Sequence, residues 1–259
     1  MNQNEFKKIT LPFEHNLFNE LSTQINFENV GKGRIGNHLV KASDKGIPIV
    51  RTTTQYNIPA HEFSDLHSKI IKSINSNFVY FPEIKFNNAL IEIYDNSYSK
   101  MKYHSDQCLD LVDDSYIGLF SCYEKPSKLE KPHIRILKIQ NKTTNEEFDI
   151  SLTHNSFVLF SVKANTNFSH KIILDSTLNQ KEKQTDNRWL GITFRESKTF
   201  IKFKNKMPYL SCGSLLELAD ENQKKEFFML RSQENRSINF TYPQINFTIS
   251  KADTLMPIR

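Results

Sequence analysis

Two segments in the first third of the chain repeat their apolar residues at the spacing of an amphipathic helix. They are HNLFNELSTQI (15–25) and PAHEFSDLHSKIIKSI (59–74). In the second segment, four apolar side chains fall on one stripe, which is typical of a helix that buries one side. The four are Phe63, Leu66, Ile70 and Ile74. We predict a helix in each segment.

From residue 86 the pattern changes to short runs rich in β-branched and aromatic residues, separated by turn-rich spacers such as NKTTN. Many short strands at this spacing favour a sandwich or barrel with helices packed outside it, so the predicted fold class is α+β, mainly β. The runs are FNNALIEIY, SYIGLFSCY, HIRILKIQN, EEFDISL, SFVLFSV, FSHKIIL, RWLGITFR and TFIKFK.

The pattern changes again after residue 205. Ser214-Leu-Leu-Glu217 matches a capping box and predicts a helix that runs to about residue 230. INFTYPQINFTIS (238–250) is strand-like with a proline interruption. We therefore divide the chain into a helical region (1–85), a β-rich core (86–205) and an extension packed on the core (206–259).

Composition narrows the setting. The chain has 259 residues, 38% hydrophobic and 24% charged, with a net charge of +5. This is the balance of a globular protein, and the mild positive charge favours acidic partners such as nucleic acid. No apolar run reaches membrane-spanning length, and the first residues lack a secretory signal. We expect a protein that makes no membrane contact, is not secreted, and is cytoplasmic, or nuclear in a eukaryote.

The three cysteines, Cys108, Cys122 and Cys212, are widely spaced and form no C-x-x-C pair. We predict free thiols. The oligomeric state stays open.

The candidate chemistry begins at His104-Ser105-Asp106. On a strand, residues two apart point to one face, so His104 and Asp106 can address one ion. His170, in the β-like run NFSHKII, is the predicted third ligand. Two imidazoles and one carboxylate are typical of non-haem Fe(II) oxygenases, although zinc enzymes use a similar set. A 2-oxoglutarate site would need arginine after the second histidine, and Arg188 and Arg195 are both available.

Three segments with these residues resemble the AlkB-like 2-oxoglutarate- and Fe(II)-dependent dioxygenases, over roughly residues 86 to 197. FNNALIEIYDNSYSKMKYHSD is similar to the family segment that begins Phe-Asn and reaches H-x-D after a tyrosine. LTHNSFVLFSVKANTNFSHKI resembles its strand, turn and second-histidine segment. NRWLGITFR resembles its closing R-x-N-L-T-F-R motif.

The resemblance implies a double-stranded β-helix (jelly roll) as the catalytic core, with the N-terminal region as a substrate lid. His104, Asp106 and His170 would bind Fe(II). Tyr94 and Arg195 would hold 2-oxoglutarate near the metal, and Arg188 would take its distal carboxylate. With O2 as the second co-substrate, 2-oxoglutarate is oxidised to succinate and CO2 while a C–H bond is hydroxylated. On an N-methyl group, the product loses formaldehyde.

Two positions depart from the family pattern. Glu92 stands where the family often has asparagine, and we expect it to turn away or to bond elsewhere, because it would repel a carboxylate co-substrate. Trp189 occupies the register of the first motif arginine, and Arg188 lies an odd number of residues before Arg195. A bulge near Gly191 would bring both arginines to one face, and we predict it; a regular strand would leave Arg195 as the sole anchor.

The substrate is the least defined feature. Alkylated nucleic acid is the first prediction, with Tyr103, Tyr56 and Arg51 as candidate substrate contacts. The alternatives are hydroxylation of a small molecule, an amino acid or a protein side chain, and an inactive β-helix used as a binding module.

Overall fold

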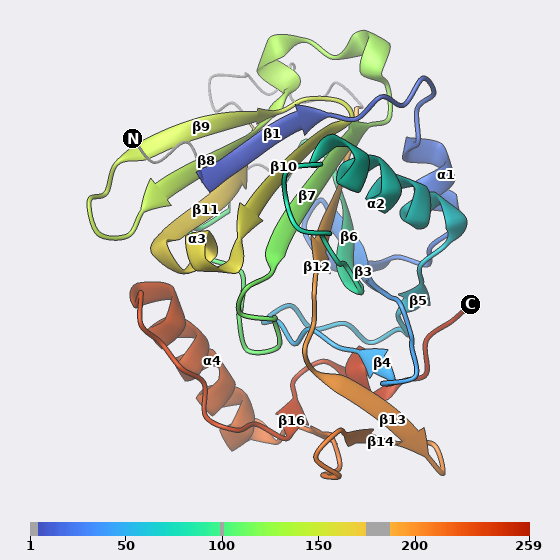
Figure 1. Ribbon diagram of the computed structural model, residues 1–259, viewed down its shortest axis with the longest axis vertical. Coiled ribbons are helices and arrows are strands. Elements are labelled where there is room, and N and C mark those ends of the chain that lie inside the picture. Colours follow the sequence, from blue (N-terminus) through green and yellow to red (C-terminus); the bar gives the residue numbers. More distant parts are fainter. Residues whose placement is uncertain (1–4, 99–100, 175–186) are drawn as a thin grey trace.

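The computed structural model describes residues 5–98, 101–174 and 187–259. Two mainly antiparallel sheets form its core (Figure 1). The larger has eight strands; seven lie in one row, and β5 (His61–Glu62) pairs with β3. The row runs β1 (Phe6–Thr10), β10 (Ser156–Ser161), β7 (Tyr116–Tyr123), β12 (Trp189–Arg195), β6 (Asn88–Tyr94), β3 (Arg34–Val40), β2 (Glu28–Gly31).

The smaller sheet has the order β11 (Phe168–Ile173), β8 (Arg135–Asn141), β9 (Glu147–Leu152). Along β8 the buried Leu137 and Ile139 alternate with the more exposed Lys138 and Gln140. The buried residues join a cluster that also contains side chains of the larger sheet. The two sheets therefore face each other, as in a jelly roll, and the candidate site lies between them.

Strand β12 shows that the two faces of the larger sheet contact different parts of the protein. Leu190, Ile192 and Phe194 point to the outer cluster, where helices α1 (Phe18–Thr23) and α2 (Asp65–Asn77) cover the sheet (Figure 1). The alternate residues of β12 point inward, because successive side chains of a strand point to opposite faces. Those inward residues are Trp189, Gly191, Thr193 and Arg195.

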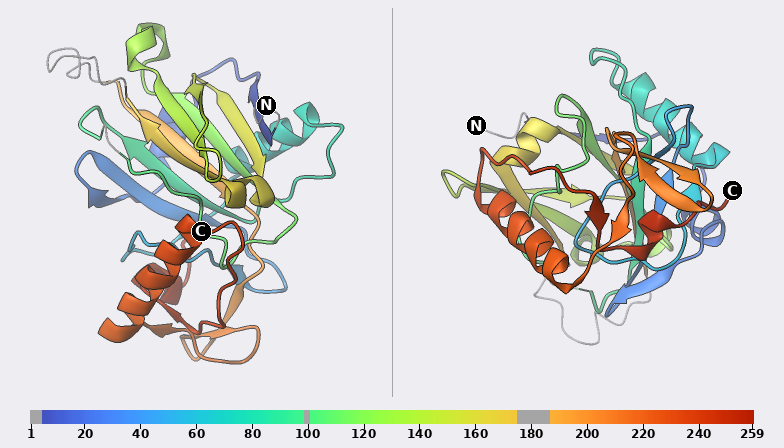
Figure 2. Two further views of the ribbon diagram at one scale, coloured as in Figure 1. Left: turned by 90° about the vertical axis from the view of Figure 1, so that its left-hand side faces the viewer. Right: turned by 90° about the horizontal axis from the view of Figure 1, so that it is seen from below.

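The C-terminal part lies beside the open end of the sheets (Figure 2). It contains α4 (Glu221–Arg236), whose Phe227 and Leu230 pack with Ile245 and Phe247 in a small separate core. Its strands are short. They are β13 (Phe200–Lys204) and β14 (Met207–Leu210), which join β4 (Ile47–Pro48), and the parallel pair β15 (Glu217–Leu218) and β16 (Phe247–Thr248). The 3-10 turns are η2 (Pro126–Lys128), η3 (Lys131–His133) and η5 (Lys251–Thr254).

The predicted fold class is confirmed, and all eight β-like runs from residue 86 contain strands. Both N-terminal helices are present, and the stripe of α2 packs on the outer cluster, but α2 begins later than predicted because Ser64 and His67 cap it. Residues 1–85 also supply strands, including β1 and β3, which their mixed polar pattern did not indicate.

The helix predicted from Ser214 to about residue 230 is present, but its predicted start is wrong, because α4 begins at Glu221. Asp220 and Gln223 form the capping box that starts α4, with Asp220 Oδ1 accepting from two backbone N–H groups at 2.8 Å. Glu217 lies in β15 instead. Of the predicted strand 238–250, two residues form β16. The three cysteines are free thiols, as predicted, and none of the helices in the described residues is long and apolar enough to cross a membrane.

Candidate metal centre and active-site cavity

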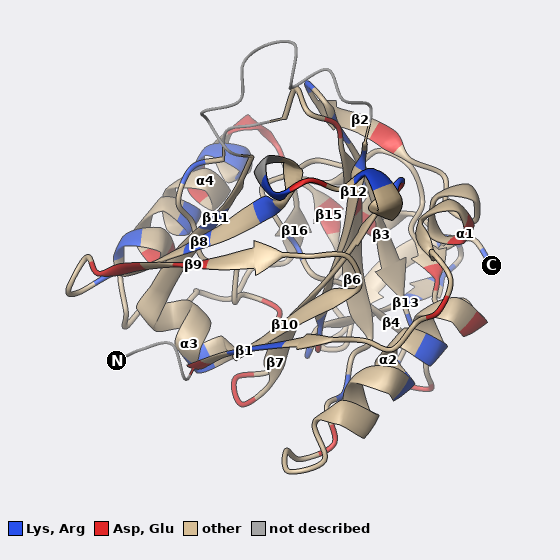
Figure 3. Cartoon of the chain, turned by 90° about the horizontal axis from the view of Figure 1, so that it is seen from above, with Lys and Arg blue, Asp and Glu red and all other residues tan. Residues whose placement is uncertain are grey.

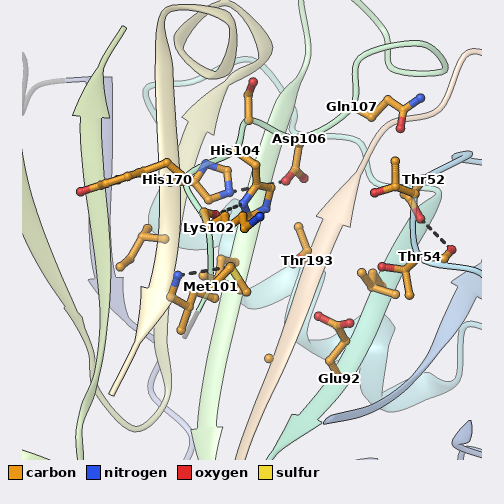
Figure 4. Close-up of a pocket in the computed structure, with 18 of the residues that line it drawn as sticks. Thr52, Thr54, Glu92, Met101, Lys102, His104, Asp106, Gln107, His170 and Thr193 are labelled. Atoms are coloured by element: carbon orange, nitrogen blue, oxygen red, sulfur yellow. Dashed lines mark hydrogen bonds and ion pairs between the residues drawn. The ribbon is translucent and has the colours of Figure 1, made fainter. Parts of the chain in front are cut away.

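The side chains of His104, Asp106 and His170 converge between the two sheets (Figure 4). One ligand atom from each lies within 4.8 Å of the other two, and His170 Nε2 is 3.5 Å from Asp106 Oδ1. Two imidazoles and a carboxylate arranged in this way can occupy one side of a metal ion and leave the other side open. The triad is therefore able to bind a metal.

Backbone contacts hold the triad together. His104 and His170 form an antiparallel bridge, with N···O distances of 3.0 and 2.6 Å. Asp106 N–H donates to Asn165 Oδ1 at 2.7 Å, and Asn165 Nδ2 donates back to the Asp106 carbonyl at 2.8 Å. Asn165 lies in α3 (Val162–Asn167), the short helix before β11. The turn that delivers His170 thus also fixes the loop that carries His104 and Asp106.

The protonation states of His104 and Asp106 suit metal binding. His104 Nδ1 lies 3.0 Å from the Lys102 carbonyl, which makes Nδ1 the donor and leaves Nε2 for an ion. Burial, together with neighbouring His170, lowers the pKa of His104 to about 3, so the imidazole is neutral near pH 7. Burial alone would raise the pKa of Asp106, but Arg195 and His170 outweigh it and hold that pKa well below its usual range.

Arg195 contacts the triad through the carboxylate of Asp106. Its Nε and Nη2 lie 2.8 and 2.7 Å from Asp106 Oδ2. Its Nη1 is buried and has no hydrogen-bond partner among the described residues. A buried donor without a partner is unfavourable, so this atom is suited to an acceptor that arrives with a ligand.

The triad opens into a cavity of about 390 Å³. Its apolar wall includes Leu119, Leu137, Phe160, Ile172 and Trp189, and polar residues gather toward the triad and the mouth. A volume of this size is in the usual range for small-molecule sites. Tyr94, predicted to hold the co-substrate, lines the cavity as well.

Glu92 lines the cavity but is fully bonded. Arg34 Nε lies 2.7 Å and Nη2 2.5 Å from Glu92 Oε1, Tyr94 OH donates to Oε2 at 2.7 Å, and Tyr56 OH donates to Oε1 at 3.2 Å. Burial and the Glu92 charge raise the pKa of both tyrosines well above its usual value, which keeps them protonated donors. Glu92 is thus engaged by protein groups, in agreement with the expectation that it bonds elsewhere.

The predicted bulge near Gly191 is wrong. β12 pairs with β6 in unbroken register from Trp189 opposite Tyr94 to Arg195 opposite Asn88. Gly191 has a different role, because a Cβ there would lie 2.2 Å from the Trp189 ring, which folds over it. The indole Nε1 donates to Ser121 Oγ at 2.5 Å. The glycine makes room for the tryptophan.

In a regular strand, Arg188 is directed away from Arg195. Its Nε and Nη2 bond Glu124 at 3.0 and 2.9 Å, its side chain is 41% exposed, and it does not line the cavity. The structure therefore does not bring Arg188 to the position where a co-substrate would lie.

The three residues predicted to contact the substrate are placed differently from one another. Tyr103 lines the cavity. Tyr56 is buried outside the lining, against Glu92. Arg51 is buried as well: its Nη2 lies 2.7 Å from Asp110 Oδ1, and its Nη1 donates to two carbonyl groups of the C-terminal extension. Both buried residues are held by protein partners, so the structure does not bring them to the cavity.

Residues 35–195, more than half of the chain, match the sequence profile described as the 2OG-Fe(II) oxygenase superfamily. The chain belongs to this superfamily. That confirms the family resemblance found in the sequence, and with it the use of Fe(II) and 2-oxoglutarate.

Solved structures with a similar fold include OsALKBH1, at 14% identity and a TM-score of 0.49, covering 74% of this chain and 98% of that chain. Another is a Pseudomonas putida prolyl-4-hydroxylase, at 10% identity and a TM-score of 0.42, covering 74% and 92%. No curated protein sequence matches the chain.

The cavity of this oxygenase suits its co-substrates. The donor set has the nitrogen and oxygen ligands that Fe(II) takes in such enzymes, and the unpartnered Arg195 Nη1 beside it offers a donor for a carboxylate. Apolar residues of the cavity wall also line the space beside them.

Four residues at this oxygenase site were missed from the sequence. Gln107, next to Asp106, lines the cavity, and both polar atoms of its side chain are buried without a partner among the described residues. Arg231 and Asn235 come from α4 and bond Ser105, between two of the triad residues. Arg34 reaches the cavity from β3. An unexplained glutamine beside H-x-D was the available signal; the other three depend on contacts between distant segments.

Proposed function

We propose that the protein is a dioxygenase in which His104, Asp106 and His170 hold Fe(II), and Arg195 and Tyr94 contact 2-oxoglutarate. The convergence of the triad beside the unpartnered Nη1 of Arg195 carries the proposal. With iron, 2-oxoglutarate and O2 bound, the site supplies oxidative decarboxylation of the co-substrate coupled to hydroxylation of a substrate C–H bond.

The residues of the chain do the positioning. Asn165 and Arg195 orient Asp106, and the Lys102 carbonyl orients His104. Arg195 Nη1 donates to a co-substrate carboxylate. The apolar wall keeps water from the reacting atoms, which favours the coupled reaction over side reactions.

For the substrate we propose an alkylated nucleobase. Support comes from Gln107, whose side-chain amide presents a donor and an acceptor beside the metal ligand and has no protein partner among the described residues. An amide of this kind can pair with the edge of a flipped base. Lys102 adds positive charge at the cavity, whereas Arg231, which also lines it, is paired with Glu234. Basic residues elsewhere are interspersed with acidic ones (Figure 3), so the contact surface is local.

A hydroxylase of a small molecule, an amino acid or a protein side chain is the second candidate. One observation favours it: α4 contributes Arg231 and Asn235 to the cavity lining and so encloses the site from the C-terminal side. A cavity of about 390 Å³ suits a compact substrate.

The first test is succinate formation from 2-oxoglutarate with Fe(II) and O2, comparing the protein with its Asp106→Ala variant. Asp149→Ala, which removes an exposed carboxylate on β9, is the matched control. Turnover that is lost only in Asp106→Ala supports the oxygenase. The absence of both turnover and metal binding in the intact protein would favour the inactive binding module.

The second test separates the substrates. Methylated and unmethylated single-stranded oligonucleotides are compared as stimulants of succinate release, beside a panel of amino acids. Stimulation by the methylated strand alone, weakening steeply with salt, supports the nucleic-acid proposal. Stimulation by an amino acid alone overturns it in favour of the second candidate.

A further inference from the structure

The distal carboxylate of 2-oxoglutarate requires a cation, and Arg195, the cation that β12 brings to the cavity, lies against Asp106 beside the triad. Trp189 stands at the position of the first motif arginine, and its indole faces the cavity. Across the sheet, Trp189 pairs with Tyr94 and Tyr94 pairs with Arg34. These three residues form one row on the inner face, so an arginine is present in this row, but it comes from β3.

Arg34 is held in a defined orientation. Its Nε and Nη2 face Glu92 Oε1 at 2.7 and 2.5 Å, and Nη2 also lies 3.2 Å from Thr54 Oγ1. A guanidinium has a second edge, formed by Nη1 and Nη2, that can accept a further carboxylate in bidentate geometry. The side chain is 17% exposed and lines the cavity. Glu92 and Thr54 take both hydrogens of Nη2, so Nη1 is the nitrogen of this second edge that is left for a ligand.

The charges around Tyr94 do not cancel. Arg34 Cζ lies 6.0 Å from the centre of the Tyr94 ring, and Arg135 Cζ lies 5.1 Å from it. Arg135 is buried, and its Nη1 and Nη2 donate to the carbonyl groups of Tyr98 and Asp95 at 2.7 Å. The exposed Asp95 carboxylate bonds Ser97, and none of the carboxylates in the described residues forms an ion pair with Arg135. Arg34 is paired with Glu92, whereas Arg135 forms no ion pair among the described residues, so one guanidinium charge beside Tyr94 has no paired carboxylate.

The cavity connects this charge to the triad. Thr193 lies between Asp106 and Glu92 in Figure 4, and Arg195, Thr193, Gly191 and Trp189 all line the cavity along β12. The row of Glu92 has glycine on both neighbouring strands, Gly36 and Gly191. Arg34 and Trp189 thus line the same cavity as the triad, at the other end of the inward-facing residues of β12.

We propose that Arg34 binds the distal carboxylate of 2-oxoglutarate through Nη1, with Glu92 as the positioning residue. This inference rests on 2-oxoglutarate being the co-substrate. The cation that binds the distal carboxylate then comes from β3 and not from β12. The methylene groups of 2-oxoglutarate lie along the Trp189 ring.

The test is calorimetric binding to the Mn(II)-loaded protein, so that no turnover is needed. Two ligands are compared: 2-oxoglutarate and 2-oxopentanoate, which has the same chain length but lacks the distal carboxylate. Binding of 2-oxopentanoate reports an intact metal site, and the ratio of the two affinities reports the distal subsite. The variants are Arg34→Gln and the double variant R34Q/E92Q. The double variant is included because R34Q alone leaves the Glu92 carboxylate without its cation. Arg188→Gln is the control.

We expect R34Q and R34Q/E92Q to weaken 2-oxoglutarate by roughly tenfold to a hundredfold, the effect of losing a charged hydrogen-bonding partner, and to leave 2-oxopentanoate within about twofold. R188Q should retain the preference of the intact protein. The proposal is overturned when both Arg34 variants keep that preference, or when R188Q loses it. An intact protein that binds neither ligand would instead overturn the assignment of 2-oxoglutarate itself, so the two failures are distinguishable.

Discussion

Arg195 and Asp106 form a buried ion pair directly behind the candidate metal: Arg195 Nη2 is 2.7 Å from Asp106 Oδ2, and the two side chains are 6% and 7% exposed. The pair leaves Asp106 Oδ1 on the side of His170. One carboxylate therefore faces a permanent cation on one side and the metal position on the other.

This geometry predicts a metal-dependent stability change. Arg195→Gln leaves the Asp106 charge buried without its partner, which should destabilise the metal-free protein by about 3–5 kcal/mol. A divalent ion at the triad would then supply the missing positive charge. We expect Mn(II) to raise the Tm of R195Q more than that of the unmodified protein, measured by thermal unfolding. Arg188→Gln, at a partly exposed pair, should change the stability by about 1 kcal/mol or less. Equal Mn(II) shifts in both proteins would contradict the role given to Arg195.

A second prediction concerns the charge of Glu92. A carboxylate that shares Arg34 with Glu92 is repelled by it, and at an effective dielectric of 20 two unit charges 4 Å apart interact by about 4 kcal/mol. Glu92→Gln keeps the size of the side chain and an oxygen that accepts from Arg34. We expect E92Q to bind 2-oxoglutarate roughly tenfold more tightly, with 2-oxopentanoate unchanged, in the same calorimetric titration. Weaker binding of 2-oxoglutarate would show that orientation of Arg34 by the full charge outweighs the repulsion.

The origin of Arg34 shows what the sequence could not provide. The strands of the core were predictable because alternation and turn spacing are local, and the triad was predictable because H-x-D and His170 lie in such segments. The partner of Glu92 was not, since Arg34 is 58 residues away and β3 contains the polar run Gly36-Asn37-His38. Only the register between β3 and β6 brings the two together.

The start of helix α4 also could not be predicted from the local sequence. Ser214-x-x-Glu217 and Asp220-x-x-Gln223 both satisfy the local capping pattern, and the structure uses the second. The choice depends on Glu217 pairing with β16, which is a contact between distant segments. The contribution of α4 to the active site was hidden for the same reason.

That contribution supports a third prediction. Asn235 Oδ1 accepts from Ser105 N at 3.1 Å, and Ser105 is 1% exposed, so Asn235→Ala leaves a buried N–H without this acceptor. The missing hydrogen bond should lower the local stability of the loop that carries His104 and Asp106 by about 1–3 kcal/mol. We expect Mn(II) affinity to fall roughly tenfold, measured by metal titration. Asn222→Ala, exposed on the same helix, is the control and should match the unmodified protein. Unchanged affinity in N235A would mean that α4 covers the loop without positioning it.

A fourth prediction concerns stability and pH. Asp253 in η5 is buried near the Asp110 carboxylate; it accepts from Thr248 Oγ1 at 2.5 Å, and Arg51 is the nearby cation. Burial raises the pKa of Asp253 to about 7, from 3.8 in the unfolded chain. Between these values the folded protein binds the extra proton, so its stability falls as pH rises from about 4 to 7, by roughly 3–4 kcal/mol at most.

Asp253→Asn removes this titration and keeps an oxygen for Thr248. We therefore expect D253N to be more stable than the unmodified protein at pH 8, and by a clearly smaller margin at pH 5, measured by denaturant unfolding at both values. Asp149→Asn, at an exposed pair with Lys138, should not change the difference between the two pH values. A stability gain in D253N that is the same at pH 5 and pH 8 would argue against proton binding by Asp253, because the linkage requires the gain to grow as pH rises toward 7.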